Sequence, residues 1–241
     1  MPASQHTIAG TVLTMPIRIR TADLHMATFL VDADAAQKLI DYSGLRVCRY
    51  LPGRAVVSLM LVRYVDGDLG QYHEFGTAVM VAPPGSDARG ARPLTRITRL
   101  SLAAAFIHHL PVDQAFTLEA GQRIWGFPKV MADFTVRDCA QFGFDISIDG
   151  QLVVAMEFRP GLPMGSRTQD LRQYSHRDGL TRETPSKMTV SGMRGRIGGA
   201  RLRLGDHAYA KELAALGLPK RALASASIAN VAMSFGDARV V

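Results

Sequence analysis

Two alternating segments joined by Asp149-Gly150 constrain the fold of this chain most. Apolar and polar residues alternate with the period of a β-strand in Phe142–Ile148 and again in Gln151–Phe158. An Asp-Gly pair favours a tight type I′ turn, because both of its residues tolerate a positive φ. The sequence therefore predicts an antiparallel hairpin and a sheet at the centre of the protein.

Other segments extend this prediction of a mainly β fold. Valine-rich apolar runs predict further strands at residues 27–31, 55–65 and 77–82, and apolar character returns at residues 100–110 and 228–241. Apolar residues at helical spacing predict a short helix over residues 35–40, capped by Asp32 or Asp34, and a second helix over residues 209–216. Residues 85–99 are polar and predict a long exposed loop.

Length and composition indicate a single domain covering residues 1–241. The chain is 47% hydrophobic, enough for a sizeable core, and has no linker or internal repeat. No apolar run is long enough to span a membrane, and the first residues do not resemble a secretory signal. The two cysteines, Cys48 and Cys139, cannot form a disulfide framework. We therefore expect a cytoplasmic protein without a membrane partner.

The net charge of +7 does not by itself indicate a nucleic-acid partner. The arginines are scattered, and the densest group, Arg194 to Arg203, is interrupted by glycines rather than interleaved with aromatic residues. We interpret that group as a solvated strand face or a contact between subunits. A basic protein of this kind remains compatible with small anionic substrates.

Lys129 is the strongest chemical candidate in the sequence. It follows Trp125-Gly126-Phe127-Pro128 directly and is one of only five lysines, against twenty-three arginines. Burial of an ammonium group among such apolar residues removes its hydration and favours the neutral amine. An ordinary lysine with a pKa of about 10.4 is neutral in only about one molecule in 2,500 at pH 7, so burial can raise the supply of nucleophile greatly.

These residues resemble the Schiff-base lysine segment of the acetoacetate decarboxylase family. In that family an aromatic-Pro-Lys tripeptide follows an upstream glycine, here Gly121, at this separation. Tyr72-His73-Glu74 is similar to the segment that carries the family's active-site glutamate. The segments 201–208 and 216–228 resemble the family's later stretches, whereas residues 85–99 and 161–189 fit poorly.

The resemblance implies a closed antiparallel β-barrel with flanking strands and a few short helices, and a homo-oligomer. It implies a lyase that decarboxylates a small β-keto acid such as acetoacetate through an iminium on Lys129, with Glu74 as the second catalytic residue and with no cofactor. Desolvation activates the lysine unless Arg123 approaches it, because Val130 stands where the founding decarboxylases carry a second lysine. His73 adjoins Glu74 on the opposite strand face and has no assigned role.

Four further residues are candidates for binding the substrate, a small oxo acid. Trp125 and Phe127 flank the lysine, and an arginine can hold a carboxylate with two hydrogen bonds. Arg20, and after it Arg18, lie near the position of the family's substrate arginine. The non-functional alternative for both arginines is that they are charged surface residues. For Glu74 the corresponding alternative is a solvated carboxylate at the end of a strand.

Departures from the family pattern leave two alternatives open. The second acidic residue expected near Ser58-Leu59 is missing, which favours either aldol or dehydration chemistry on another oxo acid or a barrel that only binds a small ligand. No metal site is expected. His108 and His109 are adjacent, so on a regular strand they face opposite sides, and no carboxylate at ligand spacing completes a set.

Overall fold

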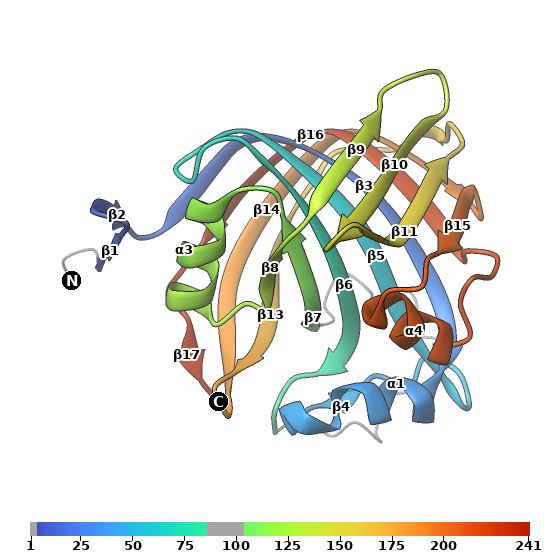
Figure 1. The fold of residues 1–241 in the computed structure, drawn as a ribbon, viewed down its shortest axis with the longest axis horizontal. Helices are drawn as coiled ribbons and strands as arrows, with labels where there is room; N and C mark the ends of the chain where they lie inside the picture. The colour runs from blue at the N-terminus through green and yellow to red at the C-terminus, as the bar shows by residue number, and fades with distance from the viewer. Residues whose placement is uncertain (1–3, 86–103) are drawn as a thin grey trace.

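The structure is a computed structural model that describes residues 4–85 and 104–241. Within these residues the chain is mainly β, with three α-helices and one 3-10 helix (Figure 1). The helices are α1 (Ala33–Ile40), η1 (Asp41–Ser43), α3 (Ala115–Trp125) and α4 (Ala208–Ala215). A separate hairpin, β1 (Gln5–Ile8) and β2 (Thr11–Thr14), projects from the body near the N-terminus. The mainly β expectation is confirmed.

Eleven strands form one strongly curved sheet. Its main path runs β4-β6-β5-β3-β16-β14-β13-β7-β8, with β12 and β17 on β14, and β7 also pairs with β6. The strands are β3 (Ile17–Asp32), β4 (Arg46–Val47), β5 (Arg54–Gly67), β6 (Tyr72–Ala82), β7 (Ala104–Val112), β8 (Lys129–Met131), β12 (Leu162–Pro163), β13 (Arg167–Arg177), β14 (Leu180–Ile197), β16 (Ala224–Phe235) and β17 (Arg239–Val240). The β13–β7 contact is short and parallel, with two residue pairs.

A four-stranded sheet in the order β15-β11-β10-β9 packs on the outside of the large sheet (Figure 1). Its strands are β9 (Asp133–Arg137), β10 (Phe142–Ile148), β11 (Gln151–Phe158) and β15 (Ala200–Leu204). The predicted hairpin is confirmed, because β10 and β11 pair antiparallel around Asp149 and Gly150, whose φ values are 50° and 72°. Both are positive, as a type I′ turn requires.

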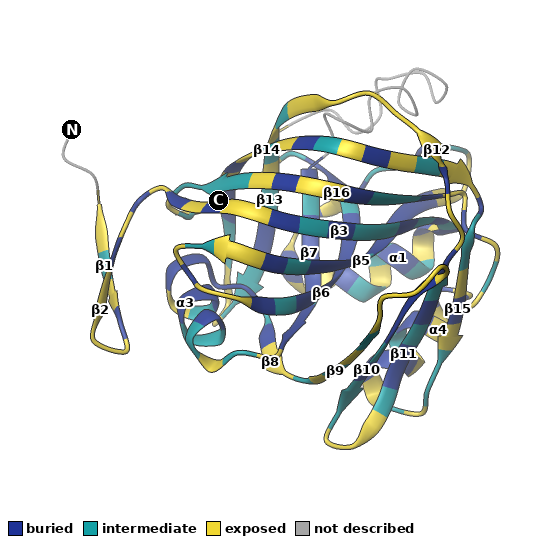
Figure 2. Cartoon of the chain, turned by 90° about the horizontal axis from the view of Figure 1, so that it is seen from above, coloured by how far each residue is buried: buried dark blue, intermediate teal, exposed yellow. Residues whose placement is uncertain are grey.

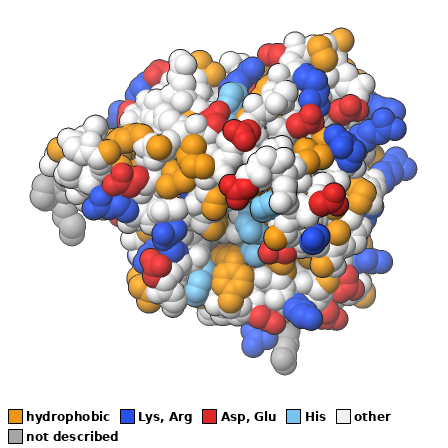
Figure 3. Space-filling model, in the orientation of Figure 1, with side chains coloured by type: hydrophobic (Ala, Val, Ile, Leu, Met, Phe, Trp, Pro, Cys, Tyr) orange, Lys and Arg blue, Asp and Glu red, His pale blue; other side chains and the backbone are white. Residues whose placement is uncertain are grey.

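The large sheet is buried on both faces along β5 and β6, whereas residues of one face of β14 and β16 are exposed. Along β3, Phe29 and Val31 pack with Phe144 of the small sheet, whereas Ala22 and Leu24 belong to a second core on the inner face. Figure 2 shows the resulting alternation of buried and exposed residues along β3, β14 and β16. On the face seen in Figure 3, basic and acidic side chains are interspersed rather than gathered into one basic patch.

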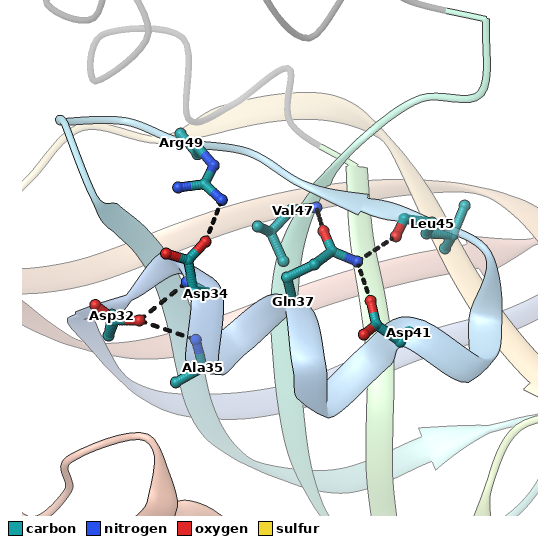
Figure 4. A network of polar contacts seen from close by, with 8 residues as sticks. All are labelled: Asp32, Asp34, Ala35, Gln37, Asp41, Leu45, Val47 and Arg49. Carbon is teal, nitrogen blue, oxygen red and sulfur yellow. Dashed lines mark hydrogen bonds and ion pairs between the residues drawn. The ribbon is translucent and has the colours of Figure 1, made fainter.

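Helix α1 begins where its N-cap predicts. The carboxylate of Asp32 accepts hydrogen bonds from the backbone N–H groups of Asp34 and Ala35, at 3.0 and 2.9 Å (Figure 4). Such a cap contributes about 1 kcal/mol. Gln37 then ties the helix to β4, because its side-chain oxygen accepts from the backbone N–H of Val47 at 2.9 Å (Figure 4). The predicted helix is confirmed and begins slightly earlier, at residue 33.

Helix α3 is not among the elements predicted from the sequence. Gly121 lies in its interior, where glycine costs about 1 kcal/mol relative to alanine. Its N-cap is Gln114, whose side-chain oxygen accepts from the Thr117 N–H in place of the usual short polar residue. Tertiary packing therefore overrides weak local signals here.

Most of the predicted loop at 85–99 lies outside the described residues, and so do residues 100–103 of the next apolar run. None of the helices in the described ranges is both long and apolar enough to cross a membrane.

The expectation that His108 and His109 face opposite sides of a strand and share no carboxylate is wrong. Thr77 of β6 pairs with His109 while Ala78 pairs with Ile107, so His108 is the extra residue of a β-bulge. Both imidazole Nε2 atoms reach one carboxylate oxygen of Glu212 on α4, at 2.8 and 2.7 Å. Hydrogen bonds from the two histidines hold the pKa of Glu212 well below its usual range, and burial lowers the pKa of His109. The completing carboxylate is distant in sequence, so no local spacing predicts it.

Candidate active site

The inner face of the large sheet lines a cavity of about 560 Å³. Most of its lining is apolar, including six methionines: Met26, Met60, Met80, Met164, Met188 and Met233. The polar lining residues are Thr28, Ser58, Tyr64, Tyr72, Glu74, Lys129, Arg167, Gln169, Arg172 and Gln173. A largely apolar cavity with a few converging polar groups is typical of a site for a small organic ligand.

Lys129 places its amine in this cavity and is only 3% exposed. Its Nζ lies 2.7 Å from Oε2 of Glu74 and donates a hydrogen bond to Oγ1 of Thr117 at 2.8 Å. It also lies 5.1 Å from the centre of the Tyr72 ring. The amine is therefore held in one place by three side chains from α3 and β6.

The backbone around Lys129 explains why the lysine points inward. Gly126 ends α3 in the left-handed conformation, with φ of 64°, and the backbone N–H of Phe127 donates to the carbonyl of Gly121 at 3.0 Å. The chain then enters β8, where Lys129 pairs with Leu110 of β7. Gln122 fixes that register by donating its side-chain amide to the Lys129 carbonyl at 2.8 Å.

Gly121 provides the space through which the lysine side chain passes. A Cβ at this position would lie 2.5 Å from Cδ and 2.6 Å from Cε of Lys129. Thr117, one helical turn earlier, lies on the same face of α3 and bonds to the amine. The separation in sequence between the upstream glycine and the lysine therefore has a steric cause.

Glu74 uses both of its carboxylate oxygens. Oε2 faces Lys129, and Oε1 accepts a hydrogen bond from the hydroxyl of Tyr64 at 2.8 Å. The Tyr64 ring stacks on Tyr72 at 4.2 Å between centres. Burial, together with the charge of Glu74, raises the pKa of both tyrosines well above the ordinary value. Both phenols therefore stay protonated at neutral pH, and Tyr64 can serve as a hydrogen-bond donor.

Lys129 has an acid–base partner within the cavity. The carboxylate of Glu74 lies 2.7 Å from the lysine Nζ, within reach for direct proton exchange. Transfer of one proton across this short contact converts the ion pair into a neutral amine and a neutral acid without leaving a buried charge. Arg123 does not assist, because it is 61% exposed and bonds to Glu119 on the surface of α3.

The structure brings four of the predicted site residues together. Trp125 and Phe127 line the cavity beside Lys129 and Glu74. Trp125 is fixed at both ends, because its indole N–H donates to the Gly236 carbonyl at 2.8 Å and its own carbonyl accepts from Ser175 at 2.6 Å.

The structure does not bring Arg18 or Arg20 to the cavity. The Arg20 side chain is 51% exposed and forms ion pairs with Asp66 and Asp68, at 2.6 and 2.7 Å. The backbone N–H of Arg18 bonds to the same Asp68. Neither arginine lines the cavity, which agrees with the alternative that both are surface charges.

Two other arginines, Arg167 and Arg172 of β13, line the cavity instead. They fall in residues 161–189, where the chain departs from the family pattern, so the resemblance could not point to them. The side-chain oxygen of Gln169 on the same strand is buried and has no hydrogen-bond partner. Arg167 and Gln169 share one face of β13. Arg172 has the opposite parity and interacts with Tyr174, and both arginines are exposed.

The structure shows which residue stands where the family's second acidic residue is expected. Ser58 lines the cavity and bonds to the hydroxyl of Thr28 at 3.1 Å. Among the described residues that line the cavity, Glu74 is the only one with a carboxylate. The segment 201–208 supplies no lining residue, and its Gly205 packs closely on Leu152 of the small sheet. Segment 201–208 therefore contributes to the packing of the small sheet rather than to the cavity.

The fold and the site together define a class of protein: a curved, mainly β sheet that encloses a buried lysine–glutamate pair. The sequence model described as "Acetoacetate decarboxylase (ADC)" matches residues 1–241. The chain belongs to this family. No curated protein matches it.

Solved structures share the fold at low sequence identity. An acetoacetate decarboxylase is 17% identical, with 94% of this chain and 89% of that chain covered and a TM-score of 0.61. The acetoacetate decarboxylase of Legionella pneumophila subsp. pneumophila str. Philadelphia 1 is 17% identical, with 100% and 92% covered and a TM-score of 0.64. The enduracididine biosynthesis enzyme MppR, complexed with the condensation product of pyruvate and imidazole 4-carboxaldehyde, is 17% identical, with 95% and 90% covered and a TM-score of 0.66.

Proposed function

We propose that this protein is a Schiff-base-forming lyase that decarboxylates a β-keto acid, with Lys129 as nucleophile and Glu74 as its proton acceptor. The observation that carries the proposal is the 2.7 Å contact between Lys129 Nζ and Glu74 Oε2 inside a largely apolar cavity. Family membership supports enzymatic activity on a small molecule. The reaction needs no metal or organic cofactor.

The first half of the reaction forms the iminium. Glu74 takes one proton from the Lys129 ammonium, and the freed lone pair attacks the ketone carbon of the substrate. The carbonyl π electrons move to oxygen, and transfer of one proton from the new ammonium nitrogen to that oxygen gives a neutral carbinolamine. Glu74, which still holds the proton it took from Lys129, returns it to the hydroxyl, and water leaves as the nitrogen lone pair forms a positively charged C=N bond. Glu74 is placed for both transfers because it lies 2.7 Å from the lysine nitrogen.

The second half breaks the carbon–carbon bond. The electron pair of the bond to the carboxylate forms a new C=C bond, the π electrons of the C=N bond move to nitrogen, carbon dioxide leaves, and a neutral enamine forms. Protonation of the enamine carbon and hydrolysis of the imine release the ketone and restore Lys129. A dry cavity favours this step because negative charge on the carboxylate is dispersed as the bond breaks.

Borohydride trapping tests the nucleophile directly. Reduction of the enzyme in the presence of a β-keto acid should leave a stable adduct on the peptide that contains Lys129, detected by mass spectrometry. Lys129→Arg is the matched control because it retains bulk and charge but has no amine that deprotonates at neutral pH. An adduct on another lysine, or none, would contradict the proposal.

The cavity indicates a substrate larger than acetoacetate. Its volume of about 560 Å³ lies in the range of pockets for larger organic ligands, and a four-carbon acid fills little of it. The methionine side chains of the lining adapt readily to an apolar chain. We therefore propose a β-keto acid with an apolar substituent, for which kcat/KM should rise about fourfold per added methylene until the cavity is full.

Arg167 and Gln169 are the proposed partners of the substrate's polar end. Both line the cavity from the same face of β13, and the Arg167 guanidinium supplies positive charge for a carboxylate, whereas Arg172 has the opposite parity on the strand. The unpartnered oxygen of Gln169 can accept a hydrogen bond from a substrate hydroxyl or enol. These residues replace Arg18 and Arg20 as the proposed carboxylate site.

A second function, aldol or dehydration chemistry on another oxo acid, is favoured by one observation. Ser58 occupies the region where the family's second acidic residue is expected, so part of the decarboxylase machinery is replaced. The similar fold of MppR in complex with a pyruvate condensation product supports this alternative. Carbon dioxide release and condensation of pyruvate with aldehydes should both be assayed, because the iminium is common to both reactions.

The third alternative is a protein that binds a small ligand without turnover. Trapping of an adduct on Lys129 without release of any product would support it. Steady product formation that is abolished in Lys129→Ala would exclude it.

The assembly and location of the protein are further proposals. The pairing of β7 with both β6 and β13 supports a barrel, which leaves few free sheet edges and encloses the site. Light scattering tests the proposed homo-oligomer. A cytoplasmic location is compatible with Cys139, which is exposed and outside any disulfide.

A further inference from the structure

Three potential metal ligands meet on the side of β7 that faces α4. Nε2 of His108 and Nε2 of His109 lie 2.8 and 2.7 Å from Oε2 of Glu212, and the three atoms all lie within 4.8 Å of one another. The cluster is separate from the candidate active site, because none of the three residues lines the cavity. In Figure 3, histidine side chains reach the surface near the middle of the face, beside acidic side chains.

Neighbouring groups hold both imidazoles in position. The hydroxyl of Tyr42 lies 2.8 Å from Nδ1 of His108, so the opposite nitrogen, Nε2, is aimed at Glu212. The His109 ring packs against Tyr209, with 3.9 Å between ring centres. Tyr209 is itself fixed by a hydrogen bond with Thr77. His108 thus has the arrangement of metal-binding histidines, with its second ring nitrogen bonded to an outer group that sets the ring's orientation, and His109 is oriented by ring packing.

We propose that His108, His109 and Glu212 bind a divalent transition metal of the zinc type. Two imidazole nitrogens and one carboxylate oxygen are ligands that Zn²⁺ accepts in sites with an open fourth position. Bonds of about 2.0–2.1 Å in a tetrahedron place ligand atoms roughly 3.3 Å apart, so the histidines and the carboxylate need to separate by about half an ångström. The half-exposed side chain of Glu212, at 40%, has room for that movement.

The metal would join α4 to the large sheet. His108 and His109 belong to β7, and Glu212 belongs to a helix more than 100 residues later in the chain, with a sequence separation of 104 from His108. Glu212 and His109 are both partly exposed, which leaves a path for the ion and room for a water at the fourth position. Binding of the ion only to the folded chain stabilises that chain by mass action.

Zinc titration of the full chain, after treatment with a chelator, tests the proposal without requiring turnover. Calorimetry should find one Zn²⁺ per chain with a micromolar or lower dissociation constant. The melting temperature should rise by about 5 °C or more at about 100-fold excess over Kd. Millimolar affinity, or no change in melting temperature, would overturn the proposal.

Variants then assign the binding to this cluster. Glu212→Gln and His109→Gln each remove a ligand and should weaken zinc affinity at least about 100-fold, whereas Tyr42→Phe removes an outer group and should weaken it about 10-fold. The matched control is His6→Gln, which removes a histidine from another histidine–carboxylate pair, with Asp237. It should bind zinc like the wild type.

The variants also contradict the proposal in clear ways. Wild-type zinc affinity in Glu212→Gln, or loss of affinity in His6→Gln, would overturn it. Circular dichroism in the presence of chelator identifies any variant that fails to fold. In that case the conservative Tyr42→Phe decides, and wild-type zinc affinity in this variant counts against the site.

Discussion

Gly121 and Lys129 are complementary in shape: the lysine side chain occupies the space that a Cβ on the glycine would need. Such a Cβ would lie 2.5 Å from Cδ of Lys129, well inside normal van der Waals separation. The amine beyond Cδ is fixed by Glu74 and Thr117, so the lysine cannot move aside without breaking those contacts. The position of the Lys129 amine thus depends on the absence of a Cβ at Gly121 in α3.

Gly121→Ala should therefore impair the reaction more than the fold. Alanine favours the helix by about 1 kcal/mol, but displacing Lys129 breaks its contacts with Glu74 and Thr117. We expect kcat/KM, and the rate of borohydride-trapped adduct formation, to fall at least about tenfold. Gly165→Ala is the control, because a Cβ there meets nothing within 4 Å. Equal rates in Gly121→Ala and wild type would refute the steric argument.

The buried pair of Lys129 and Glu74 should show strong coupling in stability. Lys129→Met leaves the Glu74 carboxylate buried without its cation, which we expect to destabilise the fold by about 3 kcal/mol at pH 7. Glu74→Gln leaves the ammonium unpaired and should have a similar effect. In the double variant both charges are absent, so much of the stability should return.

Urea denaturation of the four proteins, wild type included, measures this coupling as a double-mutant cycle. If the losses of stability in the two single variants simply add in the double variant, the coupling energy is near zero. That result would mean that Lys129 and Glu74 do not form a pair in solution.

His25 should make stability depend on pH in mildly acidic solution. It stacks on Phe142 with 3.4 Å between ring centres and bonds to Ser227 at 2.9 Å. Burial, aided by the charge of Arg63, lowers the pKa of His25 from 6.5 to about 4. Between those values the unfolded chain binds more protons than the folded one, so the free energy of unfolding rises with pH across this window.

The contribution of neutral His25 to the free energy of unfolding is complete above about pH 6.5 and is lost as the pH falls toward 4. The total change in the free energy of unfolding is about 3 kcal/mol. His25→Gln removes the titrating group and should flatten the dependence of unfolding free energy on pH between 4 and 6.5. The measurement is a series of urea titrations at several pH values, in which the slope against pH is compared rather than the absolute stability. An unchanged slope would show that His25 titrates normally.

Strand periodicity and turn chemistry predict much of the fold. The hairpin at Asp149-Gly150 and the helix capped by Asp32 were predictable because their signals are local. Helix α3 was not, since a central glycine and a glutamine cap give it weak local propensity. Its stability comes from packing, and Gly121 is explained only once Lys129 is seen beside it.

The site was predictable where one motif carries the chemistry and not where residues converge from distant strands. Lys129 and Glu74 could be named from the family resemblance, and the structure places them in contact. The place of Arg20 in the sequence does not tell whether its side chain points into the cavity. In the structure, ion pairs with Asp66 and Asp68 hold that side chain at the surface. The partner of His108 is 104 residues away and depends on a bulge that the sequence does not reveal.

Arg167 should determine affinity for the carboxylate end of the substrate. Replacing it with alanine removes positive charge from the cavity lining, and we expect KM for a β-keto acid to rise about tenfold or more. Loss of a hydrogen bond to a charged group costs about 1.5–3 kcal/mol, which corresponds to that range. The corresponding methyl ketone, which lacks the carboxylate, should bind wild type and variant equally as a competitive inhibitor.

Arg20→Ala is the matched control for this experiment. It removes an arginine of the same size from an exposed ion pair outside the cavity, and such pairs contribute about 0–1 kcal/mol to stability. Its KM should equal that of the wild type. A rise in KM in Arg20→Ala, with a wild-type KM in Arg167→Ala, would mean that Arg20, the arginine predicted from the sequence, binds the substrate carboxylate.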